Sequence, residues 1–194
     1  KRRQWGARAA ARHAKYLLAG SHFSAREIRR WYDVPPERIV AAKYGIGKGF
    51  GAVDEATVAH AREQYGLEER SVLFVGAPLG RRNLGALAGA IDEIRVTRPD
   101  VRLYGVGPER STAGSVADLR WLGYVPEEDL AAVYAAATVV AYPSTYEGFG
   151  FPVLEALACG TPVVASAAGS LPEIFAGKAW LVNDRPPEWI EALG

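Results

Sequence analysis

Two glutamates and two glycines stand close together late in the chain. Glu147 and Glu155 are eight positions apart, and Gly148 and Gly150 between them leave the backbone open to close approach. Pro152 is expected to begin a helix, whose N-terminus adds free N–H donors and the positive end of a dipole. Because carboxylates accept hydrogen bonds from vicinal hydroxyls, the segment predicts a site for a phosphate beside a sugar or ribose. In the simpler interpretation, Glu155 only complements the helix dipole and the glycines only form a turn.

Two adjacent arginines, Arg81 and Arg82, form a second candidate site. They follow an apolar run that ends at Gly76, and they precede a helix that Asn83 is expected to cap. Guanidinium groups match phosphate oxygens, and each charge-assisted hydrogen bond contributes ~1.5–3 kcal/mol. The segment lacks the Gly-x-x-x-x-Gly-Lys-[Ser/Thr] pattern of a P-loop. Taken alone, the pair is equally consistent with a solvated basic turn.

Two further loops carry weaker signals. Gly105 and Gly107 follow a short apolar run as in a dinucleotide fingerprint, but Arg110 stands where the third glycine belongs, which argues against NAD. In a later loop, a flat base could lie against Tyr124 and Val125 and bond to their backbone. A plain strand-to-helix connection explains that loop equally well.

The elements around these residues alternate between strand and helix. The expected strands cover residues 16–19, 39–42, 71–75, 101–104, 120–122, 139–142, 162–165 and 179–182. They are continuous apolar runs, which predicts a parallel sheet covered on both faces. Ligands of such sheets bind at the carboxyl ends of the strands, so every loop after a strand is a candidate site. Ser170 to Glu173 is interpreted as a capping box, and Trp121 and Trp180 as core residues.

Composition excludes several classes of protein. The 194 residues carry a net charge of +1, with 49% hydrophobic and 23% charged residues, as in soluble globular proteins. A single cysteine and three histidines argue against a disulfide framework and a metal centre. The longest apolar run, residues 131–143, is too short to span a bilayer, and no signal peptide is visible. The expected compartment is the cytosol.

The ends of the chain suggest a piece of a larger protein, because methionine is absent and the last residues follow the start of a helix near Pro187. Four glycines between residues 45 and 51 indicate a connector between domains. Residues 1–30 hold nine lysines and arginines against one acid, Glu27. Such a segment is typically a solvated helix face, although it would also suit nucleic acid or an anionic membrane surface.

Together, these segments resemble the family-four retaining glycosyltransferases of the GT-B fold. Residues 143–164 are similar to the family's Glu-x7-Glu signature, with Glu147 and Glu155 as its two glutamates. Residues 80–84 resemble its Arg-Lys-Asn-Leu diphosphate loop, with Arg82 where lysine is commoner.

Other parts of the chain extend the resemblance to nearly its whole length. Residues 122–126 are similar to the segment that contacts the base, and the Leu-Pro-Glu-Ile at 171–174 stands at the family's usual distance. The resemblance implies an α/β fold of GT-B type, with a Rossmann-like doubly wound parallel sheet at 54–194 as the C-terminal donor domain. Residues 1–43 would end the N-terminal acceptor-side domain, 44–53 would link the two, and the closing C-terminal helix would be missing.

The resemblance also implies roles for individual residues. Arg81, Arg82 and Glu147 would be catalytic, the arginines holding the leaving diphosphate and Glu147 the donor sugar. The implied donor-binding residues are Gly76, Arg81, Arg82, Tyr124, Val125, Leu130, Glu147, Gly148, Phe149, Gly150, Phe151, Pro152, Val153 and Glu155. No metal and no other cofactor is implied, since the nucleotide diphosphate sugar is the substrate.

The implied reaction transfers a sugar to an acceptor hydroxyl with retention of configuration. GDP-mannose and a UDP-sugar both remain open as donors, and the acceptor would be a sugar, a lipid-linked molecule or a small molecule. An alternative is a nucleotide-binding or regulatory module without turnover, and a nucleic-acid binder ranks third, so no nucleic-acid partner is expected. The expected location is cytoplasmic, with peripheral contact at the inner face of the membrane also open.

Overall fold

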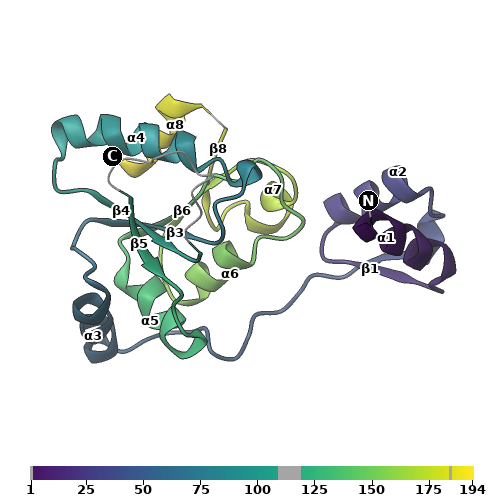
Figure 1. Cartoon of the computed structure of the whole chain (residues 1–194), viewed down its shortest axis with the longest axis horizontal. Coiled ribbons are helices and arrows are strands. Elements are labelled where there is room, and N and C mark those ends of the chain that lie inside the picture. Colours follow the sequence, from purple (N-terminus) through teal and green to yellow (C-terminus); the bar gives the residue numbers. More distant parts are fainter. Residues whose placement is uncertain (1, 109–118, 184) are drawn as a thin grey trace.

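The computed structural model describes residues 2–108, 119–183 and 185–194. A larger α/β unit and a smaller unit are joined by an extended connector (Figure 1). The smaller unit contains α1 (Arg2–His13), β1 (Leu17–Ala19), α2 (His22–Tyr32), the 3₁₀ turn η1 (Pro36–Arg38) and β2 (Ile39–Ala41). Its two strands pair in parallel, and the guanidinium of Arg38 donates to carbonyls at the end of α1, including that of Ala11 at 3.0 Å. The extended connector lies between these two units.

Six parallel strands form the sheet of the larger unit. They are β3 (Ser71–Val75), β4 (Arg102–Val106), β5 (Leu119–Gly123), β6 (Val139–Tyr142), β7 (Val163–Ser166) and β8 (Trp180–Val182). Their order across the sheet is β5-β4-β3-β6-β7-β8, and every neighbouring pair is parallel. The all-parallel sheet expected from the apolar runs is thus confirmed.

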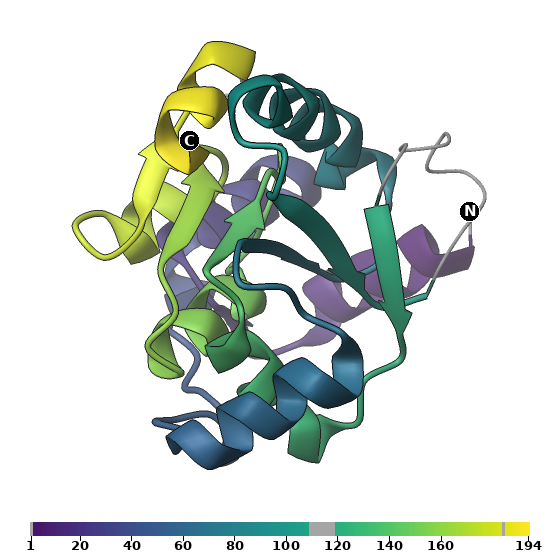
Figure 2. The ribbon, with the colours of Figure 1, turned by 90° about the vertical axis from the view of Figure 1, so that its left-hand side faces the viewer.

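Helices cover both faces of this sheet (Figure 2). They are α3 (Glu55–Tyr65), α4 (Leu84–Thr97), α5 (Glu127–Ala136), α6 (Phe151–Ala158), α7 (Leu171–Phe175) and α8 (Pro186–Leu193). Successive side chains of a strand point to opposite faces. Val72 and Phe74 accordingly pack in one cluster with α4 and α8, and Leu73 and Val75 pack in another with α5 and α6. Both faces of β3 are therefore buried, which explains its uninterrupted apolar sequence.

The strand order places a topological switch point between β3 and β6. From β3 the chain moves outward to β4 and β5, and it then returns to place β6 on the other side of β3. The chain segments that leave the carboxyl ends of β3 and β6 lead to α4 and α6, which cover opposite faces of the sheet. Ligands of such sheets bind at this point. Arg81 and Arg82 follow β3, and Glu147 follows β6.

Several local predictions are wrong. The strand expected to end at 104 continues through Gly105 to Val106, because a Cβ at Gly105 would lie 2.7 Å from the ring of Trp121 on β5 and glycine permits that packing. The predicted capping box does not form: Ser170 makes no side-chain cap, and Glu173 accepts from the smaller unit instead. Trp180 is 55% exposed on the edge strand β8, not a core residue.

Candidate functional site

The loops that follow β3 and β6 lie against each other at the switch point. A 3₁₀ turn, η2 (Gly80–Arg82), carries the two arginines. The carbonyl of Arg81 accepts the backbone N–H of Thr145 at 2.8 Å and its hydroxyl at 3.1 Å. The two loops are therefore tied together through backbone atoms, which sets the arginines beside the segment that begins with Glu147.

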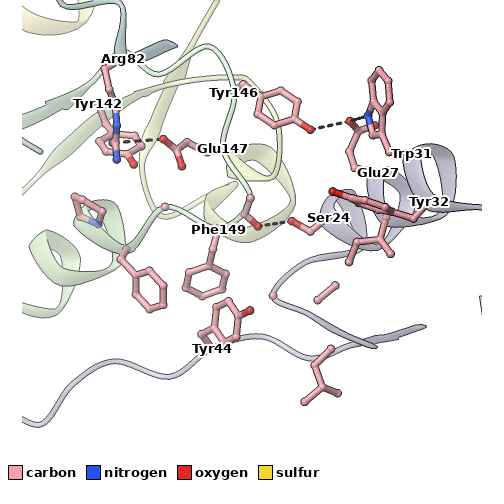
Figure 3. Close-up of a pocket in the computed structure, with 18 residues that line it drawn as sticks. Ser24, Glu27, Trp31, Tyr32, Tyr44, Arg82, Tyr142, Tyr146, Glu147 and Phe149 are labelled. Atoms are coloured by element: carbon pink, nitrogen blue, oxygen red, sulfur yellow. Dashed lines mark hydrogen bonds and ion pairs between the residues drawn. The ribbon is translucent and has the colours of Figure 1, made fainter. Parts of the chain in front are cut away.

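One carboxylate holds both arginines. Oε1 of Glu147 accepts from Nη1 of Arg81, and Nη1 of Arg82 lies 3.4 Å from the same oxygen. The hydroxyl of Ser144 also donates to that oxygen at 2.8 Å. The guanidinium of Arg82 lies 4.7 Å from the centre of the Tyr142 ring, within the range of a cation–π contact (Figure 3).

The charges at this site do not cancel. Two guanidinium groups face the single carboxylate of Glu147, whose side chain is 10% exposed, and Arg82 is 13% exposed. Nε of Arg82 is buried and donates to no group in the part of the chain that the structure describes. Burial strengthens the field of an uncompensated charge. The site therefore has an excess positive charge and an unused donor, as a site for an anion requires.

Two glycines allow the segment from Glu147 to Gly150 to pack closely against α7 and the loop before it. Gly150, which precedes α6, has a φ of 96°, and a Cβ there would lie 2.6 Å from Leu171. Gly169 has a φ of 60°, and a Cβ there would lie 2.5 Å from the carbonyl oxygen of Glu147. Both angles fall in the left-handed region, which glycine adopts without steric cost. A side chain at either position would displace the segment that contains Glu147.

Many of the residues implied by the resemblance surround one cavity of about 670 Å³. Those that line it are Arg82, Glu147, Gly148, Phe149, Gly150, Phe151 and Pro152. Arg81 does not line the cavity, but its guanidinium contacts Glu147, which does. Gly76 lies next to the site, since a Cβ there would be 3.6 Å from the guanidinium carbon of Arg82.

The remaining predicted residues lie elsewhere. Val153 is fully buried and bonds through its N–H to the carbonyl of Gly150, so its side chain faces the core. Val125 is also buried, whereas Tyr124 is 85% exposed and Leu130 is half-buried. None of the four lines the cavity at Glu147.

The helix α6 begins at Phe151, one residue before the expected Pro152, and Glu155 lies beyond its first turn. Its carboxylate accepts the hydroxyl of Tyr134 at 2.7 Å and does not line the cavity. Burial raises the pKa of Glu155, opposed by the bond from Tyr134 and assisted by the charge of Glu127. The structure therefore brings Glu147, but not Glu155, to the arginines.

The smaller unit supplies contacts that local sequence reasoning missed. The hydroxyls of Ser21 and Ser24 donate to the carbonyl of Gly148 at 2.7 and 3.0 Å. The carboxylate of Glu173 accepts the first backbone N–H groups of α2, those of His22 at 2.7 Å and Phe23 at 2.9 Å. These partners are more than 120 positions apart in sequence, so no local pattern relates them.

In the described ranges 2–108, 119–183 and 185–194, no group of three or more His, Cys, Asp or Glu side chains is placed to hold a metal ion. Within the same ranges, no helix has the length and apolar character needed to cross a membrane.

Residues 69–194 match the family described as Glycosyl transferases group 1. The chain belongs to this family. It is 36% identical to O-antigen chain mannosyltransferase B of Escherichia coli, over 93% of this chain and 50% of that protein. It is 34% identical to a D-inositol 3-phosphate glycosyltransferase of Segniliparus rotundus, over 89% of this chain and 42% of that protein. The chain thus spans about half the length of these relatives.

Solved structures confirm the fold of this group 1 glycosyltransferase chain. The structure of Anabaena Alr3699/HepE in complex with UDP and glucose has a TM-score of 0.82 at 20% identity, covering 98% of this chain and 55% of that one. Sucrose-phosphate synthase from Thermosynechococcus elongatus has a TM-score of 0.76 at 29% identity, covering 99% and 51%. The α/β fold of GT-B type expected from the sequence is therefore confirmed.

Proposed function

We propose that this chain binds the diphosphate of a nucleotide sugar and that the protein transfers the sugar to an acceptor hydroxyl with retention of configuration. The observation that carries the proposal is the convergence of Arg81 and Arg82 at the switch point, where they outnumber the carboxylate they share. Family membership supports the same reaction class.

Positive charge fixed beside the leaving group is what the transfer step requires. As the bond to the sugar breaks, negative charge grows on the diphosphate and positive charge on the sugar ring. Arg81 is 42% exposed and can turn from Glu147 toward a phosphate, while buried Arg82 offers its unused Nε donor. Glu147 then lies beside the electron-poor sugar. The departing phosphate takes the proton of the acceptor hydroxyl, and the two guanidinium groups supply charge without a metal ion.

The donor is best sought among GDP-mannose and UDP-sugars. The name of the Escherichia coli relative, a mannosyltransferase, supports mannose as the donor sugar. The HepE structure in complex with UDP and glucose supports a UDP-sugar as the donor. The acceptor would be a sugar, a lipid-linked molecule or a small molecule.

Calorimetric titration tests the donor site. The chain is titrated with UDP, GDP and ADP in the presence of EDTA, and the titrations are repeated with Arg82→Ala. We expect micromolar binding of one nucleotide and at least a ten-fold loss in the variant, because charge-assisted bonds are worth ~1.5–3 kcal/mol each. Arg98→Ala, at an exposed arginine after α4, is the matched control. Binding that is absent, or equally strong in both variants, would refute the proposal.

A second candidate is nucleotide binding without sugar transfer. The two arginines and Glu147 favour it, because these groups can bind a diphosphate whether or not a sugar is transferred. Radiolabelled GDP-mannose and UDP-glucose separate the candidates: product formation supports transfer, and tight nucleotide binding with no product supports the binding module.

We also propose a cytoplasmic protein that contacts an anionic membrane surface. Exposed cations on α1 and α2 support this location, namely Arg8, Arg12, Arg26, Arg29 and Arg30. Such contact is electrostatic and screened by salt. The chain should co-sediment with phosphatidylglycerol vesicles at low salt and stay in the supernatant at 0.5 M salt. It should not co-sediment with phosphatidylcholine vesicles at either salt concentration. Equal retention by both vesicle types would contradict the proposal.

A further inference from the structure

The cavity at Glu147 has a second end, away from the arginines. Arg82 and Glu147 form one end, and α2 of the smaller unit forms the other through Glu27, Trp31 and Tyr32 (Figure 3). Its volume of about 670 Å³ is in the range of ligand pockets. One end of the cavity is therefore cationic, and the other is aromatic and acidic.

The carboxylate of Glu27 uses one of its two oxygens, Oε2, to accept hydrogen bonds from neighbouring side chains. Its Oε2 accepts the hydroxyl of Tyr146 at 2.7 Å and the indole N–H of Trp31 at 3.0 Å. Its Oε1 has a longer contact, 4.0 Å to Nη1 of Arg30. The bond from Tyr146, followed by that from Trp31, lowers the pKa of Glu27, so the group is an ionised acceptor at neutral pH. An ionised carboxylate has about four lone-pair sites, about two on each oxygen, so Oε1 can accept from a hydroxyl donor.

Trp31 presents an exposed ring next to this carboxylate. The residue is 64% exposed although its N–H is bonded to Glu27. The guanidinium of Arg30 lies 5.4 Å from the ring centre, within the range of a cation–π contact. A saccharide has an apolar C–H face and a rim of hydroxyls. The face suits stacking on an indole, and the hydroxyls suit donation to a carboxylate.

We propose that Glu27 and Trp31 form the acceptor subsite, and that the acceptor is a saccharide that stacks on Trp31 and donates a hydroxyl to Glu27. This inference rests on the proposed function, which places the donor at the opposite end. Tyr146 connects the two ends. Its hydroxyl holds Glu27, its carbonyl accepts from Arg81 at 3.3 Å, and Glu147 is the next residue. Tyr146 thereby links the proposed acceptor subsite to the arginines.

Calorimetric titration with mannobiose, a disaccharide of mannose, in the presence of saturating GDP, tests this subsite. We expect Trp31→Ala and Glu27→Ala each to weaken mannobiose binding at least ten-fold. Their affinity for GDP should stay within two-fold of the unmodified chain, whereas a purely structural defect would reduce both. Trp180→Ala and Glu37→Ala, at exposed residues outside the cavity, are matched controls and should bind mannobiose normally.

The inference would be overturned if the unmodified chain does not bind mannobiose detectably. It would also be overturned if both Trp31→Ala and Glu27→Ala bind mannobiose with an affinity within two-fold of the unmodified chain. If GDP and UDP do not bind, the proposed function fails instead. The mannobiose titration is then run without nucleotide, and its dependence on Trp31 and Glu27 still decides the subsite. Trp31→Phe adds a graded test, because phenylalanine keeps the stacking face but loses the N–H that orients Glu27. The affinity of Trp31→Phe for mannobiose should lie between that of the unmodified chain and that of Trp31→Ala.

Discussion

Replacement of Glu147 by glutamine tests whether the two arginines are held ready for an anion. The amide keeps the size of the side chain and can still accept the hydroxyl of Ser144. It removes the negative charge that contacts both Arg81 and Arg82. The variant therefore changes the electrostatics of the site with little change in packing.

The loss of stability in Glu147→Gln depends on how deeply the ion pairs of Glu147 are buried. Arg82 and Glu147 are 13% and 10% exposed, and removal of one partner from a buried ion pair costs ~3–5 kcal/mol. Arg81 is 42% exposed, so solvent screens its share to roughly 0–1 kcal/mol. The ring of Tyr142 still faces Arg82 in the variant and moderates the loss. We expect a loss of roughly 2–4 kcal/mol in the free energy of unfolding, which corresponds to a Tm about 4–16 °C lower for a chain of this size.

Thermal unfolding with and without GDP measures both consequences. The diphosphate replaces the lost negative charge, so we expect GDP to raise the Tm of Glu147→Gln more than that of the unmodified chain, and to bind it about ten-fold more tightly. Glu68→Gln is the matched control, because Glu68 also contacts two arginines, Arg102 and Arg120, but is 41% exposed. It should lose less than about 1 kcal/mol. An unchanged Tm in Glu147→Gln, or weaker GDP binding, would refute the reasoning.

Three further substitutions test neighbouring parts of the site. Burial raises the pKa of Glu155 above 4.5, so its stabilising contribution is present below 4.5 and is lost as pH rises through the folded value. Glu155→Gln should therefore raise Tm at pH 7, with the gain shrinking toward pH 4.5. Gly169→Ala should lower Tm and GDP affinity together, because its Cβ meets the carbonyl of Glu147. Glu173→Ala should lose about 1–2 kcal/mol in urea unfolding, because α2 loses two N–H acceptors.

The core of the site follows from the sequence because it depends on a topological rule. Apolar runs identify strands buried on both faces, and parallel strands place the loops after them at one edge. Arg81, Arg82 and Glu147 stand directly after such runs, so their meeting needs no knowledge of distant packing. The smaller set of predictions that fails depends on packing between elements. Gly105 ends a strand by local preference but lies inside β4, where it accommodates the ring of Trp121.

Glu173 shows why local pattern misleads at a contact between units. The spacing from Ser170 to Glu173 fits a capping box, and in an isolated helix the glutamate would turn back to its own N-terminus. Here α2 presents two free N–H groups at its own N-terminus, and Glu173 accepts those of His22 and Phe23 instead. Burial acts to raise the pKa of Glu173, but these two bonds and the nearby charges of His22 and Arg26 leave it lowered. The carboxylate thus stabilises a helix more than 140 positions away in the chain.

The α2 end of the cavity was beyond sequence reasoning for the same reason. Glu27 and Trp31 are four positions apart on an ordinary basic helix, a spacing that also occurs on solvated helix faces. Their proposed role depends on Tyr146, whose hydroxyl donates to Glu27 although the two residues are 119 positions apart in sequence. Because Tyr146 precedes Glu147, α2 contacts the residue next to the shared carboxylate. The smaller unit is therefore part of the site, and the arginines, Glu147 and α2 have to be tested together.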